Sequence, residues 1–179
     1  MLPELFLKRM QTLLGSEFDE FLASYARPRN AGLRLNPLKA DSTAGLEAFG
    51  LSPVPWAENG FYYDPDTRPG LSPLHEAGVF YMQEPSAMAP AALLDAQPDE
   101  WVLDLCAAPG GKSTQIAGQL WGKGLLVCNE IQPKRARILA GNIERMGISN
   151  ALVLNEHPQR LESRFAGCFD RVLVDAPCS

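Results

Sequence analysis

The chain has 179 residues, a net charge of −5 and 46% hydrophobic residues. This composition excludes overall disorder, since disordered chains lack the apolar residues that form a core. The 15 glycines and 15 prolines indicate many turns, but they follow no Gly-X-Y period, which excludes collagen. No apolar run approaches the ~20 residues of a membrane span, and the charged N-terminal segment is unlike a signal peptide.

Four cysteines lie at positions 106, 128, 168 and 178, and no two of them form a CxxC pair. This spacing argues against a zinc knuckle or a redox dithiol, so no metal is expected. Reduced thiols in an intracellular, cytoplasmic protein are the simplest interpretation.

The negative charge is concentrated in the first half of the chain. Residues 1–97 carry seven basic and twelve acidic side chains, whereas residues 98–179 carry nine of each. An acidic protein binds nucleic acid only through local basic patches, because that affinity depends on Lys and Arg neutralising phosphates. One such patch comprises Arg27, Arg29, Arg34 and Lys39. The alternative interpretation of this patch is a basic face that contacts only solvent. Arg29 and Arg34 are the candidates for RNA contact, with an interdomain role as the alternative for Arg34.

The first part of the chain, residues 1–76, predicts a small α/β domain. Apolar residues at helical spacing predict a helix over 2–14 and a second helix just after it. The segment GLRLN at 32–36 predicts a strand. Residues 50–75 are rich in proline, glycine and aromatic residues, which favours turns and short strands.

Residues 77–179 have a different pattern, in which strands and helices alternate. A strand is expected at 79–83 and a helix at 86–95. Buried apolar runs then predict four strands, at 101–107, 125–131, 151–155 and 171–176. Helical patterns fall between them, at 111–121, 133–147 and 159–165. This alternation is typical of right-handed βαβ units and a parallel sheet.

The most informative segment is DLCAAPGGKST at 104–114, where a strand runs into a glycine-rich turn and then a helix. The free N–H groups of such a helix end hold an anion, either phosphate or carboxylate. Similar turns that bind nothing are common, so the segment alone leaves function open. GGKST is similar to the end of a Walker A loop, with Asp175 as a Walker B aspartate. However, Cys106 occupies a position where that loop requires glycine.

An adenosyl cofactor on a doubly wound sheet is the other interpretation. Such a site requires an acidic residue at the end of the second strand, about twenty residues after the glycine-rich turn, to bind the ribose hydroxyls. Glu130 lies twenty residues after Gly110 and closes the segment LLVCNE. This feature favours S-adenosylmethionine, with its carboxylate on the loop and its ribose on Glu130. Asn155, which ends the third strand, is either an adenine contact or a simple turn residue.

Asp175 and Cys178 follow the fourth strand, and this pair suits chemistry on a pyrimidine. C5 of cytosine is a weak nucleophile, but a thiolate that adds to C6 creates an enamine able to attack a sulfonium methyl. A carboxylate or carboxylic acid near N3 stabilises the charge that develops on the ring. An inert small residue is the alternative for Cys178.

Together, VLDLCAAPGGKST, LLVCNEI, NIERMG and VLVDAPCS resemble the bacterial Sun-type, RsmF-like family of rRNA cytosine-5 methyltransferases. SYARPRNAGLRLN, PVPWAENGFYY and HEAGVFYMQEPSAM agree, so the resemblance spans nearly the whole chain. It implies an α/β fold: a Rossmann-like methyltransferase core with a parallel sheet of order 3-2-1-4, preceded by a small α/β domain that engages RNA. It also implies S-adenosylmethionine as the cofactor and rRNA as the substrate.

The resemblance assigns roles to individual residues. The family's cofactor positions match Glu130, Asn155 and Asp175 together with the loop residues Cys106, Ala107, Ala108, Pro109, Gly110, Gly111 and Lys112. Lys112 is expected to reach toward Asp175. Cys178 matches the cysteine that assists release of the methylated base in this family. DNA cytosine methyltransferases instead use their Pro-Cys cysteine as the nucleophile, so the role of Cys178 depends on the analogy chosen. Members of the family often have an aspartate at the position of Asn155, so this chain lacks that negative charge.

The sequence ends at Ser179, before the later Thr-Cys motif that carries the family's nucleophile. We therefore expect a fragment with an incomplete sheet that binds its cofactor weakly and does not methylate. A P-loop nucleotide hydrolase and a non-catalytic RNA-binding module on a methyltransferase fold are the two alternatives.

Overall fold

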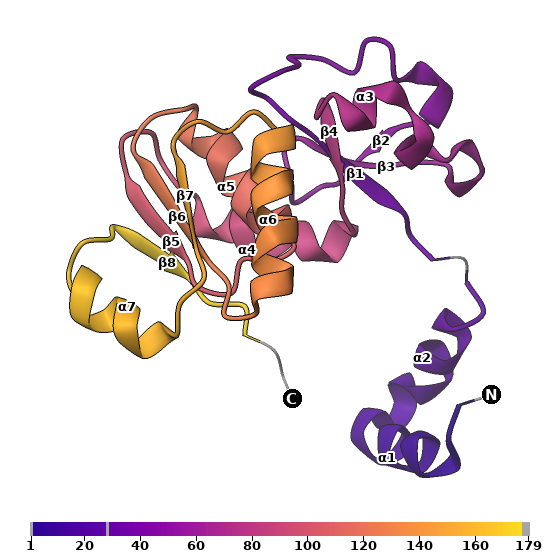
Figure 1. Ribbon diagram of the computed structural model, residues 1–179. Helices are drawn as coiled ribbons and strands as arrows, with labels where there is room; N and C mark the ends of the chain where they lie inside the picture. The colour runs from indigo at the N-terminus through magenta and orange to yellow at the C-terminus, as the bar shows by residue number, and fades with distance from the viewer. Residues whose placement is uncertain (1, 28, 177–179) are drawn as a thin grey trace. The chain divides into compact units, whose positions relative to one another are not determined.

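A computed structural model describes residues 2–27 and 29–176, and the chain divides into two compact units, Met1–Asn30 and Ala31–Ser179 (Figure 1). The first unit consists of helices α1 (Glu4–Leu14) and α2 (Phe18–Ser24), joined by a 3-10 turn at Gly15–Glu17. Phe21 of α2 packs against Phe6 of α1, with ring centroids 6.2 Å apart. The two predicted helices are confirmed.

The second unit begins with a four-stranded antiparallel sheet of order β2-β3-β1-β4. Its strands are β1 (Gly32–Leu35), β2 (Ser52–Pro53), β3 (Gly60–Tyr62) and β4 (Phe80–Met82). Four short helices connect them: η2 (Glu47–Phe49), η3 (Pro65–Thr67), η4 (Pro69–Leu71) and α3 (Pro73–Glu76). Leu33, Leu35, Leu46 and Phe80 form the buried core of this sheet.

Strand β4 lies after residue 76, the predicted end of the first domain, yet it pairs within the antiparallel sheet. The parallel sheet begins only at Trp101. The two sheets belong to the same compact unit. The division of the chain between residues 76 and 77, with an RNA-engaging domain before it, stays a prediction.

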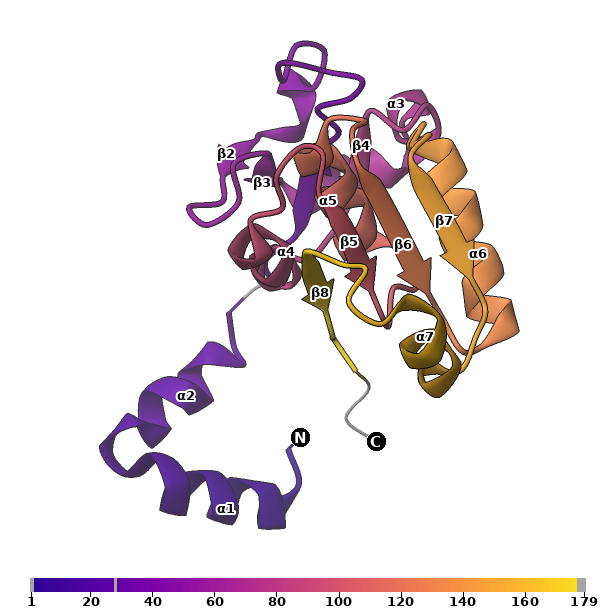
Figure 2. The same ribbon diagram turned by 90° about the vertical axis from the view of Figure 1, so that its left-hand side faces the viewer.

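The parallel sheet has the order β7-β6-β5-β8, which confirms the expected order 3-2-1-4. Its strands are β5 (Trp101–Asp104), β6 (Leu125–Asn129), β7 (Ala151–Leu154) and β8 (Arg171–Leu173). All neighbouring pairs are parallel, so the four carboxyl ends lie at one edge (Figure 2). Parallel pairing follows from the βαβ alternation, since each helix carries the chain back to the starting edge.

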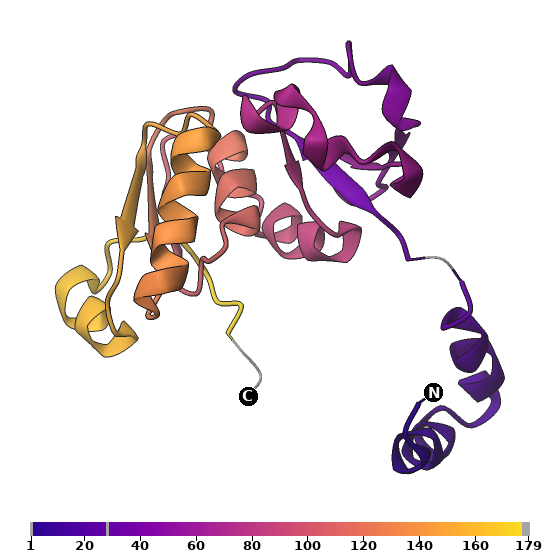
Figure 3. The same ribbon diagram turned by 45° about the vertical axis from the view of Figure 1, so that its right-hand side comes forward.

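Helices α5 (Gly111–Leu120) and α6 (Pro133–Arg145) cover one face of the parallel sheet, and the antiparallel sheet lies beyond α5 (Figure 3). Helix α5 is therefore enclosed, and seven of its ten residues are buried. The short helices η5 (Pro85–Met88) and α4 (Ala89–Leu94) pack against α5, and α7 (Pro158–Phe165) joins β7 to β8. Among the described residues, no helix is long and apolar enough to cross a membrane.

Candidate functional site

The four strands of the parallel sheet end at one carboxyl edge (Figure 2), and most of the predicted cofactor residues follow these strand ends. The glycine-rich loop follows β5, Glu130 follows β6, Asn155 follows β7, and Asp175 lies just after β8. Ligands of open α/β sheets bind at this edge, in the crevice outside the strand ends. The structure thus assembles the candidate residues in one place, while their roles in binding stay predictions.

Backbone hydrogen bonds fix the loop between β5 and α5. The N–H of Leu105 donates to the carbonyl of Leu173 at 3.0 Å, and the N–H of Ala107 donates to the carbonyl of Asn129 at 2.8 Å. The loop is thereby tied to the strands on both sides of β5. Gly110, at φ 115°, then turns the chain into α5. No side chain caps this helix end, so its first N–H groups face the edge without an intrahelical acceptor.

Glu130 supplies a buried carboxylate at the end of β6. Its side chain is only 3% exposed. Oε1 accepts the N–H of Gln132 at 2.9 Å, and Oε2 lies 3.2 Å from Nη1 of Arg135. A charge buried this deeply requires such partners, because it has lost its water. The carboxylate oxygens also have lone pairs left over, which suits the two hydroxyl donors of a ribose.

Arg135 links Glu130 to the loop. Its Nη2 donates to the carbonyl of Ala108 at 2.7 Å, while its Nη1 faces Glu130. One guanidinium therefore holds both parts of the predicted cofactor site. Sequence reasoning missed this residue, since it lies in a basic run at the start of α6 that is typical of a solvated helix face.

Asn155 is held by the turn after β6. Its Nδ2 donates to the carbonyl of Glu130 at 2.7 Å and to the carbonyl of Ile131 at 2.9 Å. Both amide protons are thus used to position the segment that carries Glu130. The side-chain carbonyl Oδ1 points away from these bonds as an acceptor, which is the group that would meet an amino donor of adenine.

Lys112 reaches Asp175, as the sequence predicts. The Nζ of Lys112 lies 2.5 Å from Oδ2 of Asp175, and this ion pair joins the start of α5 to the segment after β8. Oppositely charged groups at this distance form a charge-assisted hydrogen bond. The other predicted catalytic residue, Cys178, lies outside the described residues.

Asp104 is a further charged group at the edge, which sequence reasoning missed. It is the last residue of β5 and is 1% exposed. Its Oδ2 accepts the hydroxyl of Ser113 at 2.7 Å, and its Oδ1 has no partner among the described residues. Burial raises the pKa of Asp104 to about 6, and the Ser113 hydroxyl and the Lys112 charge oppose this shift. Its position as the last residue of a buried strand is the only signal in the sequence.

Arg34 does not fit the RNA-contact role expected of it. The residue is 2% exposed, and its Nε donates to Oε1 of Gln83 at 3.0 Å. Its Nη2 donates to the carbonyl of Gly111 at 3.1 Å and to the hydroxyl of Thr114 at 2.7 Å. Arg34 therefore joins β1 to α5, which is the interdomain alternative. Burial lowers the pKa of Arg34 to about 9. Arg29 is exposed, and its contact with RNA stays a prediction.

The thiols of Cys106 and Cys128 are not poised for nucleophilic attack. Cys128 is fully buried in β6, and burial raises the pKa of its thiol to about 12. Burial also raises the pKa of Cys106, whose thiol neighbours the carboxylates of Asp104 and Glu130. Neither thiol is therefore a thiolate at neutral pH. Cys168 is exposed on the segment after α7.

Two family models match the chain and together cover almost all of it. Residues 2–85 match the N-terminal domain of 16S rRNA methyltransferase RsmF, and residues 91–179 match 16S rRNA methyltransferase RsmB/F. Curated relatives include the ribosomal RNA small subunit methyltransferase F of Vibrio campbellii, at 39% identity, and that of Escherichia coli, at 38%. Each alignment covers 99% of this chain but 40% of the relative, so the chain spans about two fifths of their length.

Solved structures with the same fold come from Pyrococcus horikoshii. A methyltransferase homologue is 30% identical, with a TM-score of 0.85, over 99% of this chain and 60% of that one. The NSun6 protein, solved with the ligand SFG, is 19% identical with a TM-score of 0.84, over 98% of this chain and 71% of that one. The similarity to NSun6 concerns the fold alone.

Proposed function

Because the chain belongs to the RsmB/F family of 16S rRNA methyltransferases, we propose that it forms the cofactor-binding part of an RNA (cytosine-5)-methyltransferase. Its cofactor is S-adenosylmethionine and its substrate is small-subunit rRNA. One observation carries this proposal: the uncapped N-terminus of α5 and the buried carboxylate of Glu130 follow neighbouring strands of the sheet and share Arg135. An anion site beside a ribose acceptor is the pattern that an adenosyl amino acid requires.

Each chemical group of this cofactor has a partner among the residues at the carboxyl edge. The loop from Cys106 to Lys112 offers backbone N–H groups to the methionine carboxylate. Glu130 accepts from the ribose hydroxyls, and Oδ1 of Asn155 accepts from the adenine amino group. Bound there, S-adenosylmethionine supplies a methyl group on a sulfonium, which is an electrophile. Asp104 ends β5, where the same loop begins, and its Oδ1 has no hydrogen-bond partner among the described residues.

The Lys112–Asp175 pair supplies the polar groups for the base. Asp175 is more exposed than Lys112, so its carboxyl group is the part of the pair that faces an incoming ring. Its role is to stabilise the charge that develops at N3 when a thiolate adds to C6. Lys112 holds the carboxyl group in place through a short charge-assisted bond. In this proposal Cys178 assists release of the methylated base.

Binding of RNA is assigned to residues 1–76, with Arg29 as a contact. The chain is acidic overall, so local cations must provide the phosphate contacts. A ribosomal substrate implies action in the cytoplasm. The family matches favour this methyltransferase function over a P-loop nucleotide hydrolase.

Calorimetric titration of the chain with S-adenosylmethionine, and separately with ATP–Mg, tests the proposal. We expect S-adenosylmethionine to bind and ATP–Mg not to bind. Glu130→Ala should weaken cofactor binding by roughly 10- to 100-fold, since two hydrogen bonds to a charged group are lost. Glu144→Ala, which removes an exposed glutamate of α6, is the matched control. Binding of ATP–Mg alone, or equal affinities in both variants, would overturn the proposal.

A further inference from the structure

Asn142 lies on α6, about two turns after Arg135, and contacts the loop between β5 and α5. Its Nδ2 donates to the carbonyl of Pro109 at 2.8 Å. The hydroxyl of Tyr81, on β4, donates to the same carbonyl at a longer distance of 3.4 Å. Proline has no backbone N–H, so the carbonyl is the one main-chain group of Pro109 that forms hydrogen bonds. Asn142 is the closer of the two side chains that hold it.

The orientation of the Asn142 amide is fixed by Arg145, which lies three residues further along α6. Nη2 of Arg145 donates to Oδ1 of Asn142 at 3.3 Å, and Nη1 donates to the carbonyl of His75 at 2.6 Å. A guanidinium can only donate, so the oxygen of Asn142 must face Arg145. A backbone carbonyl can only accept, so the amino group of Asn142 must face Pro109. Both contacts therefore require the same orientation of the amide.

The carbonyl of Pro109 and the N–H of Gly110 belong to one peptide plane. This peptide bond is trans, so the carbonyl and the N–H point in opposite directions. Because the carbonyl points to Asn142 on α6, the N–H of Gly110 points away from α6. It donates to no backbone acceptor among residues 2–27 and 29–176. Gly110 directly precedes α5, so its N–H is a donor available to an anion at that helix end.

Gly110 itself packs against the same part of α6. A Cβ added at Gly110 would lie 3.3 Å from Cδ1 of Leu139 and 3.5 Å from Cβ of Asn142. The loop therefore lies directly on this helix, and no other side chain separates Gly110 from Asn142. A change at Asn142 thus acts on the loop itself.

Arg135 holds the preceding carbonyl of the loop, that of Ala108. The peptide bond after Ala108 leads to Pro109, which has no N–H to orient. Asn142 and Arg135 therefore act on different peptide planes, and only the plane that Asn142 binds carries an N–H donor.

We propose that Asn142 is a positioning residue, which aims the N–H of Gly110 at the carboxylate of S-adenosylmethionine. This inference rests on the proposed function. Without the amide of Asn142, the carbonyl of Pro109 keeps only its longer bond to Tyr81, and the peptide plane is free to rotate. The N–H of Gly110 then no longer points steadily at the carboxylate. The adenosine part of the cofactor does not contact this peptide, so its binding is unaffected.

Paired titrations with S-adenosylmethionine and with its decarboxylated analogue test the inference, because the two ligands differ only in the carboxylate. We expect the natural protein to bind S-adenosylmethionine more tightly than the analogue. Asn142→Ala should weaken binding of S-adenosylmethionine by about fivefold, as expected for one weakened hydrogen bond, and leave binding of the analogue unchanged. General damage to the pocket would weaken both ligands alike, so the ratio of the two affinities separates positioning from a purely structural role.

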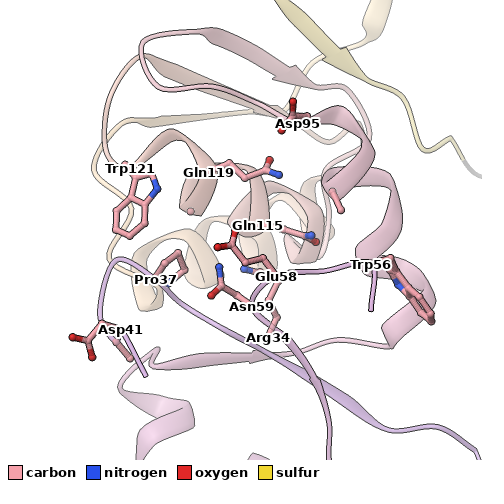
Figure 4. Close-up of a pocket in the computed structure, with 13 residues that line it drawn as sticks. Arg34, Pro37, Asp41, Trp56, Glu58, Asn59, Asp95, Gln115, Gln119 and Trp121 are labelled. Atoms are coloured by element: carbon pink, nitrogen blue, oxygen red, sulfur yellow. The ribbon is translucent and has the colours of Figure 1, made fainter. Parts of the chain in front are cut away.

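Tyr81→Phe is a second variant, which removes only a hydroxyl. It should weaken binding of S-adenosylmethionine by about twofold and spare the analogue, since its bond to Pro109 is long. Glu144→Ala, at an exposed position of α6, is the matched control for Asn142→Ala. A further control is Glu58→Ala, because Glu58 lines a separate cavity of about 520 Å³ against the second half of α5 (Figure 4). Neither control should change the affinity for either ligand.

The possible failures are distinguishable. If Asn142→Ala weakens binding of both ligands equally, or leaves the affinity for S-adenosylmethionine unchanged, this inference is overturned and the proposed function stands. Equal affinities of the natural protein for the two ligands would overturn it in the same way. If the natural protein does not bind S-adenosylmethionine, the proposed function is overturned, and this inference with it.

Discussion

Arg34 of β1 and Arg135 of α6 both donate to backbone carbonyls near the β5–α5 junction: Arg34 to Gly111, the first residue of α5, and Arg135 to Ala108 in the loop before it. Their surroundings differ. Arg34 is almost fully buried and its hydrogen-bond acceptors are all neutral, whereas the Arg135 side chain is 43% exposed and pairs with the carboxylate of Glu130. A buried guanidinium with fixed neutral partners holds two elements together. A half-exposed guanidinium beside a carboxylate can adjust when a ligand arrives. The same residue type thus serves folding in one region and the proposed cofactor site in the other.

Arg34→Met should give the largest effect on stability. The variant keeps an apolar stem but leaves the side chains of Gln83 and Thr114 without their buried donor. We expect the free energy of unfolding to fall by about 3 kcal/mol, as is usual when one partner of a buried polar network is removed. Urea denaturation followed by tryptophan fluorescence measures this loss. Arg29→Met, at an exposed position, should change stability by less than about 0.5 kcal/mol. A similar small change in both variants would contradict the structural role of Arg34.

Asp104→Asn should change the pH dependence of stability. Burial raises the pKa of Asp104 in the folded protein to about 6, above its ordinary value of 3.8. The unfolded chain therefore loses this proton at lower pH than the folded protein does. As a result, the free energy of unfolding decreases between about pH 4 and pH 6 and is constant above that range. A pKa shift of about two units sets an upper limit of roughly 3 kcal/mol on this decrease in the free energy of unfolding.

The measurement for Asp104 is a series of urea titrations from pH 4.5 to pH 7 on the natural protein and on Asp104→Asn. Other carboxylates titrate in both proteins, so the difference between the two curves isolates this residue. We expect Asp104→Asn to gain stability relative to the natural protein as the pH rises to 6. Parallel curves would show that Asp104 titrates normally.

Arg135→Ala should have a smaller effect, confined to the cofactor edge. Loss of the guanidinium frees both the carboxylate of Glu130 and the carbonyl of Ala108. We expect affinity for S-adenosylmethionine to fall by about 5- to 10-fold, equivalent to about 1 kcal/mol. Arg137→Ala removes the same charge from an exposed position of α6 and should leave affinity unchanged.

A double variant shows whether Arg135 acts through Glu130. If it does, Arg135→Ala should weaken cofactor binding much less in a Glu130→Ala background than in the natural protein, because coupled residues are not additive. Arg135→Lys should restore part of the affinity, since lysine keeps the charge but lacks the planar fork. Fully additive effects would contradict a shared role.

The elements of the parallel sheet could be predicted because each strand is a short apolar run, and a helical pattern separates each strand from the next. The grouping of candidate residues at the carboxyl edge could be predicted, because parallel strands bring every carboxyl end to the same side. Lys112 and Asp175 were paired correctly from their motif positions. These features depend on local pattern and on topology alone.

Contacts between elements that are distant in the sequence could not be predicted. Arg34 lies in a short strand flanked by basic residues, and nothing in that pattern shows that α5 covers it. Arg135 lies in a basic run that is typical of a solvated helix face, yet it turns inward to Glu130 and Ala108. The charge state of Asp104 depends on its burial, which follows from packing and not from spacing.

The most direct test of the cofactor edge is a ¹H–¹⁵N spectrum of the chain titrated with S-adenosylmethionine. Backbone N–H groups that bind a carboxylate change their chemical shift strongly. We therefore predict that the amides of Gly110, Gly111 and Lys112 shift together with that of Glu130. The amides of Gln119 and Trp121, at the far end of α5, should not shift. If the loop amides stay in place under S-adenosylmethionine and move with ATP–Mg, the edge is a nucleotide phosphate site and the account is wrong.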